Sequence, residues 1–119
     1  TSERLQLVAG DFFKGGLPAA DAYALMEVIH DWADDDAVKI LTAVRKAAPR
    51  GARVLLVEAI VSDEGPPFAK VLDVIMLAVT GGRERTAAEY EGLLEAAGLR
   101  LERIVPTQSQ CMVIESTLG

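Results

Sequence analysis

The sequence predicts an α/β fold, in which strands and helices alternate along the chain. Three observations predict it: short apolar runs typical of buried strands, apolar residues at helical spacing between them, and glycine or proline where the runs end. The chain has 119 residues, 50% of them hydrophobic and 25% charged, a composition typical of globular proteins. At this length it is one domain or a portion of one.

The first half of the chain predicts three strands and one helix. Residues 5–9 form a short apolar strand, and residues 22–29 form a longer one in which Glu27 is the polar exception. An acidic run from Asp34 begins the helix, because carboxylates cap free amide groups and favour the positive end of the helix dipole. Residues 53–61 form the third strand. The apolar positions expected on the buried face of the helix are Ala37, Ile40, Leu41, Val44 and Ala48.

The second half predicts two helices followed by two strands. Residues 68–79 carry a helical apolar stripe after a Gly-Pro-Pro loop. Thr86 caps the next helix, with Glu89 three residues later as a capping box. Its core face carries Leu93, Leu94 and Ala97. Residues 99–105 and 111–116 are the last two strands, joined by a polar turn.

Charge and cysteine content exclude several classes of protein. The net charge of −6 argues against a nucleic-acid partner, which needs a basic surface. Cys111 is the only cysteine, so no internal disulfide can form and a reducing compartment is indicated. No uncharged apolar run is long enough to span a membrane, and no metal-ligand spacing occurs. We therefore expect a soluble, cytoplasmic chain without a metal or a membrane partner.

His30 is the first candidate for chemistry. It is the only histidine, and it follows directly on an apolar run. Ligands of open α/β sheets bind at the carboxyl ends of strands. A neutral imidazole there can remove a proton from a weakly acidic hydroxyl near neutral pH. The alternative is a structural histidine that caps the strand end or is hydrogen-bonded in the core.

Two glutamates are candidates to act with His30. Glu58 interrupts an apolar strand, where a buried carboxylate is costly unless it is paired. Paired with His30, it would orient the imidazole and stabilise the imidazolium; otherwise it is a strand-end residue in solvent. Glu84 follows two glycines that permit a tight turn. Its alternative role is as part of a solvated, charged loop.

Four further residues have a functional and a structural interpretation each. Asp11 follows a strand end and is either a ligand for a cofactor's amine or hydroxyl, or a turn aspartate. Phe12 and Trp32 either form the wall for a planar ring or belong to the core. Met76 is either core or a substrate wall. No glycine-rich phosphate loop and no serine nucleophile elbow is present.

Five stretches, in this order, resemble the C-terminal part of a class I S-adenosylmethionine-dependent O-methyltransferase. They are residues 10–13 (GDFF), 29–32 (IHDW), 51–58 (GARVLLVE), 73–77 (DVIML) and 81–86 (GGRERT). The chain is similar to the small-molecule family that includes plant caffeic acid and flavonoid enzymes and bacterial polyketide-tailoring enzymes. The resemblance covers almost the whole chain. It implies a partial Rossmann-like methyltransferase sheet, lacking the first two strands and the glycine-rich turn, with residues 1–119 as the C-terminal portion of the catalytic domain.

The resemblance implies methyl transfer from S-adenosylmethionine to a phenolic or enolic hydroxyl of a small molecule. His30 matches the general base, and Glu58 and Glu84 match the acidic residues that flank it. Met26 falls where plant members carry a lysine near the cofactor. The positions that match cofactor contacts are Asp11, Phe12, Met26 and Trp32, and those that match substrate contacts are Asp73 and Met76.

The resemblance also bears on assembly. Relatives begin with a helical dimerisation domain, so we expect a homodimer formed through that domain or by edge-strand pairing. Two strands that this sequence lacks stand, in the family's sheet, between residues 5–9 and 22–29. An open strand edge invites pairing with another chain. We expect a fragment that is inactive alone; the alternatives are a non-enzymatic interaction module and a relative that keeps the fold but catalyses another reaction.

Overall fold

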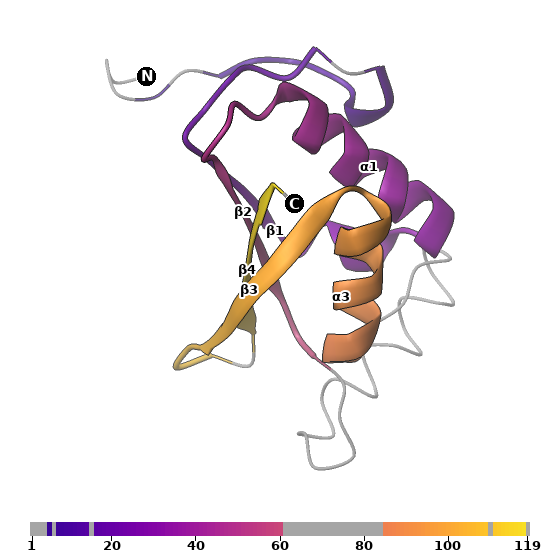
Figure 1. Ribbon diagram of the computed structural model, residues 1–119, viewed down its shortest axis with the longest axis vertical. Helices are drawn as coiled ribbons and strands as arrows, with labels where there is room; N and C mark the ends of the chain where they lie inside the picture. Colours follow the sequence, from indigo (N-terminus) through magenta and orange to yellow (C-terminus); the bar gives the residue numbers. More distant parts are fainter. Residues whose placement is uncertain (1–4, 6, 15, 61–84, 110, 119) are drawn as a thin grey trace.

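The computed structural model describes residues 5, 7–14, 16–60, 85–109 and 111–118, and only the backbone of Phe12. The two described α-helices lie on the same side of a four-stranded sheet (Figure 1). In chain order the elements are η1 (Phe12–Lys14), β1 (Ala22–Met26), η2 (Ile29–Asp31), α1 (Asp34–Ala47), β2 (Arg53–Glu58), α3 (Ala87–Ala96), β3 (Leu99–Pro106) and β4 (Met112–Leu118). The α/β class expected from the sequence is confirmed.

The sheet is mixed rather than parallel. Its strand order is β1-β2-β4-β3. β1 and β2 are parallel, whereas β4 is antiparallel to both β2 and β3. The helix α1 supplies the crossover between the two parallel strands, as the alternating pattern predicts. The last two strands follow each other after a short turn, and such a connection can only join antiparallel strands.

Strand ends differ from the predicted ones where the backbone leaves the sheet. β1 ends at Met26, because Glu27 has a φ of 54° in the left-handed region and turns the chain. The predicted strand end near residue 29 is instead a 3₁₀ turn. β2 ends at Glu58, and Ile60 makes one isolated bridge with Arg85.

The predicted strand over residues 5–9 is wrong for the described residues of that stretch. Leu5, Leu7 and Val8 are 57%, 77% and 68% exposed, and none of them belongs to the sheet. A strand is stabilised by a hydrogen-bonded neighbour and by burial of alternate side chains. Neither is available to this segment among the described residues, so its apolar content alone does not produce a strand.

The helices follow the predicted patterns. The expected face of α1 is buried except at Ala48, which is half-buried. Ala33 occupies the N-cap without a side-chain hydrogen bond, so the following aspartates act on the helix through charge and not as caps. The capping box of Thr86 and Glu89 is confirmed. The predicted helix over residues 68–79 lies outside the described residues. The core between helices and sheet includes Ile40, Leu41, Val54, Leu56, Leu94 and Ile114.

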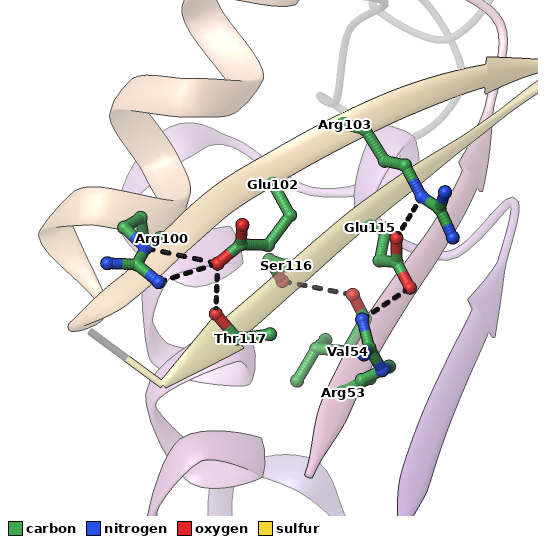
Figure 2. A network of polar contacts seen from close by, with 8 residues as sticks. All are labelled: Arg53, Val54, Arg100, Glu102, Arg103, Glu115, Ser116 and Thr117. Atoms are coloured by element: carbon green, nitrogen blue, oxygen red, sulfur yellow. Dashed lines mark hydrogen bonds and ion pairs between the residues drawn. The ribbon is translucent and has the colours of Figure 1, made fainter. Parts of the chain in front are cut away.

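An ion-pair network lies on the opposite face of the sheet (Figure 2). Glu115 alternates along β4 with the buried Ile114 and therefore points away from the helices. Its Oε1 accepts a 2.8 Å hydrogen bond from Arg53 Nη1, and its Oε2 accepts one from Arg103 Nε. These bonds cross three strands and join β2, β4 and β3.

Because of this network, we expect part of the free energy of unfolding to be lost at acid pH. The hydrogen bond from Arg103 is the main cause that holds the pKa of Glu115 below its ordinary value of 4.5. A carboxyl whose pKa is lowered in the folded state contributes stability above its unfolded-state pKa, and this contribution is lost as the pH falls through the folded-state pKa. We expect the wild-type chain to exceed Glu115→Gln in free energy of unfolding at neutral pH, and this difference to shrink below about pH 4. Urea unfolding at both pH values measures it; an equal difference at both would contradict the prediction.

Candidate active site

The site is built where the parallel strands β1 and β2 end side by side. Glu27 N donates a 2.9 Å hydrogen bond to Val57 O, which extends the pairing of the two strands by one residue. The chain then forms the turn η2, whose central residue is His30. His30 is buried, with 7% of its surface exposed. The predicted position at a strand end therefore becomes a turn directly after the strand.

Glu58 is completely buried beneath this turn. It follows Val54 and Leu56 on the helix-facing side of β2, and the burial alternates along that strand. Its Oε1 accepts hydrogen bonds from the backbone N–H groups of Ile29 at 3.1 Å and His30 at 3.4 Å. These are orphan donors at the start of the 3₁₀ turn, so the carboxylate supplies the cap that no local side chain provides.

The other oxygen of Glu58 contacts the imidazole. Oε2 lies 2.9 Å from His30 Nδ1. A carboxylate only accepts hydrogen bonds, so the nearer of the two carboxylates beside the ring favours the neutral tautomer with its proton on Nδ1 and its lone pair on Nε2. Asp31 Oδ1 lies 3.4 Å from Nε2. Two carboxylates lie beside the imidazole, so the arrangement can hold the positive charge that the ring gains when Nε2 accepts a proton.

Arg85 lies against the same turn and is also completely buried. Its Nη1 donates to Ile29 O at 3.2 Å and its Nη2 donates to Trp32 O at 2.7 Å. Nε donates to Asp34 Oδ1 at 3.0 Å. Sequence reasoning did not single out Arg85, because a buried arginine gives no periodic signal; its place beside Glu84 in the GGRERT stretch was the available pointer.

The predicted cofactor residues do not all converge. Trp32 is half-buried and packs edge-on against Phe13, with ring centroids 5.2 Å apart and an interplanar angle of 74°. Both rings line an open groove of about 1030 Å³ beside α1. Asp11 is exposed, and its Oδ1 accepts a 2.9 Å hydrogen bond from Phe13 N, as in a turn aspartate. Met26 is 68% exposed at the end of β1. Neither Asp11 nor Met26 lines the groove.

The remaining predicted site residues lie outside what the structure describes: Glu84, Asp73, Met76 and the side chain of Phe12. Within the described ranges, no helix has the length and apolar character needed to cross a membrane. The same ranges contain no cluster of three His, Cys, Asp or Glu side chains that could hold a metal ion.

Comparison with known proteins identifies the family. The model of the O-methyltransferase domain family matches residues 1–100. The chain belongs to this family. It is 39% identical over 115 residues to the phenazine O-methyltransferase of Lysobacter antibioticus, covering 96% of this chain and 34% of that protein.

Two solved structures extend the similarity to the fold. Human N-acetylserotonin methyltransferase in complex with S-adenosylmethionine superposes with a TM-score of 0.93 at 33% identity, covering 100% of this chain and 35% of that one. An O-methyltransferase from neocarzinostatin biosynthesis, in complex with S-adenosylmethionine and 2-hydroxy-5-methyl naphthoic acid, gives a TM-score of 0.85 at 37% identity, covering 96% and 33%. The chain therefore spans about a third of the length of the proteins it matches.

Proposed function

We propose that residues 1–119 are the C-terminal part of the catalytic domain of an S-adenosylmethionine-dependent O-methyltransferase. In this proposal His30 is the general base that deprotonates a phenolic or enolic hydroxyl of a small-molecule acceptor. One observation carries it: the buried His30 Nδ1 lies 2.9 Å from Glu58 Oε2, which leaves Nε2 as the proton acceptor.

The residues of this chain supply the proton chemistry. The acceptor's hydroxyl proton passes to His30 Nε2 as its oxygen forms the new O–C bond, and Glu58 stabilises the imidazolium that results. Bound S-adenosylmethionine would supply a methyl group that is activated by its bond to a positively charged sulfur. When this bond breaks, the sulfur group leaves as a neutral thioether. Because the methyl group is activated, holding the acceptor oxygen in line contributes much of the rate.

The support for Trp32 as a cofactor contact is its place two residues after His30 and its packing against Phe13. Trp32 and Phe13 form one wall of a groove large enough for a drug-sized ligand. We assign Trp32 to the cofactor on this ground. We also assign Asp11 to it, because its exposed carboxylate can accept a hydrogen bond from a hydroxyl or amine. Phe12 and the exposed thioether of Met26 are assigned only by resemblance.

The assignments outside the described residues rest on the family match. Glu84 is proposed as the second acidic residue beside His30, and its support is the peptide bond to Arg85, which contacts the His30 turn. Asp73 and Met76 are proposed as substrate contacts by resemblance alone.

Assembly and location follow as further proposals. The family member from which this chain comes is proposed to be a cytoplasmic homodimer, and the 119-residue chain to be inactive alone. The support for inactivity is that the chain spans about a third of the length of its relatives, and the homodimer rests on the resemblance alone. The lone cysteine is consistent with a reducing compartment.

The decisive experiment compares two polypeptides. The longest polypeptide encoded by the gene is expected to convert S-adenosylmethionine to S-adenosylhomocysteine in the presence of a hydroxylated aromatic acceptor. The isolated 119-residue chain is expected to show no turnover, and at least 10²-fold weaker cofactor binding by isothermal titration, equal to about 2.7 kcal/mol. Cofactor binding of equal strength by both would contradict the proposed division of the site.

A second candidate function is a non-enzymatic interaction module. It is favoured by the exposed apolar segment of Leu5, Leu7 and Val8, which is the kind of surface that a partner covers. Size-exclusion chromatography with light scattering tests this candidate: a concentration-independent monomer of the isolated chain argues against it.

A further inference from the structure

Arg85 combines complete burial with hydrogen bonds to one short turn. It precedes the N-cap of α3 and pairs with Ile60 just beyond β2, so its backbone is tied to two elements. Its guanidinium reaches two carbonyl oxygens, Ile29 O and Trp32 O, that lie on either side of His30 along the chain. None of the side chain is exposed.

The turn is therefore held from two sides by opposite charges. Glu58 accepts from the N–H groups of Ile29 and His30, and Arg85 donates to the carbonyls of Ile29 and Trp32. Charge-assisted hydrogen bonds of this kind are about twice as strong as neutral ones. Fixing the backbone on both sides of His30 restricts where its imidazole can lie.

A third contact anchors the guanidinium itself. Asp34 Oδ1 accepts from Nε at 3.0 Å and lies 2.9 Å from Nη2. The carboxylate belongs to the first turn of α1, so Arg85 joins the His30 turn to the start of that helix. A lysine has one charged nitrogen in place of this planar fork, and it cannot reproduce three contacts in different directions.

We propose that Arg85 is a positioning residue for His30, acting through the backbone of residues 29–32 to hold Nε2 in place for proton transfer. The inference rests on the proposed role of His30 as general base. A displacement of about 1 Å in such a site can lower the rate by about 10²-fold, so the geometry at Arg85 bears directly on catalysis.

The first test uses the chain's only histidine as its probe. In the 119-residue chain, the ¹⁵N-labelled imidazole of His30 gives one set of resonances without ambiguity of assignment. We expect Arg85→Lys to broaden or double these resonances, whereas Arg103→Lys, at an arginine paired with Glu115, leaves them unchanged. In the longest polypeptide, Arg85→Lys is expected to lower kcat by about 10–10²-fold while KM for the cofactor changes less than about twofold.

A second variant covers the case in which Arg85→Lys fails to fold. Asp34→Ala keeps Arg85 but removes its anchor, and the Asp34 side chain is 56% exposed. We expect it to broaden or double the imidazole resonances of His30, as Arg85→Lys does, but to a smaller extent. Asp35→Ala removes the same charge from the same helical turn and is the matched control.

The outcomes separate this inference from the proposed function. Unchanged imidazole resonances and unchanged kcat in a folded Arg85→Lys or Asp34→Ala variant would overturn it and leave Arg85 a structural residue only. Absence of methyl transfer by the longest wild-type polypeptide would count against the proposed function. The imidazole resonances would still decide whether Arg85 positions His30.

Discussion

Glu58→Gln is expected to lower kcat for methyl transfer by up to about 10⁴-fold, the scale seen when a histidine is held in the wrong tautomer. The carbonyl oxygen of the new amide must take the place of Oε1, because two backbone N–H groups donate there. The amide NH₂ then faces His30 Nδ1, 2.9 Å from the present Oε2. It donates to Nδ1, so the ring proton moves to Nε2, which can no longer accept a proton.

Imidazole ¹⁵N shifts of the 119-residue chain report this tautomer directly, and a turnover assay of the longest polypeptide reports the rate. Glu115→Gln is the matched control, since it changes a buried strand glutamate that pairs with arginines away from His30. We expect it to leave both the tautomer and kcat unchanged. An Nδ1-protonated ring and near-wild-type turnover in Glu58→Gln would contradict the prediction.

His30→Gln is expected to lower kcat by about 10²–10⁴-fold, the usual contribution of a positioned general base. Some activity should persist, because alignment of acceptor and methyl group can contribute up to about 7–11 kcal/mol by itself. The variant keeps an amide N–H group near Glu58, so the buried Oε2 retains a donor while Oε1 keeps its two backbone donors. The wild-type rate should fall at acid pH as the imidazole takes up a proton, and the variant should lose this dependence.

Three measurements check the His30 prediction. The pH–rate profile shows whether the acid limb disappears, circular dichroism shows that the variant folds, and calorimetric titration shows that cofactor affinity is retained. A variant with the wild-type profile and rate would remove His30 from the role of base. Loss of cofactor binding in step with kcat would instead indicate a structural role.

Much of the fold was predictable because its signals are local. The buried face of α1 follows from apolar residues at helical spacing, and the start of α3 follows from Thr86 and Glu89 three residues apart. The burial of Glu58 was one of two interpretations, and the cost of a buried carboxylate pointed to His30 as its partner. These inferences need only neighbouring residues or one strongly constrained side chain.

The failures concern contacts between distant residues. An apolar run such as residues 5–9 resembles a strand, but whether it becomes one depends on a neighbouring strand. The end of β1 depends on the left-handed backbone at Glu27, a residue type that does not favour it.

The sequence by itself determined the α/β class, the helix faces and caps, and the candidate pair of His30 and Glu58. Only the tertiary structure decided that this pair meets in a 3₁₀ turn and that Arg85 holds the turn from the other side. Glu58 contacts Ile29 across 29 residues and Arg85 contacts it across 56. Periodicity and capping act within one or two helical turns, whereas partners this far apart are chosen by the packing of the whole sheet and its helices.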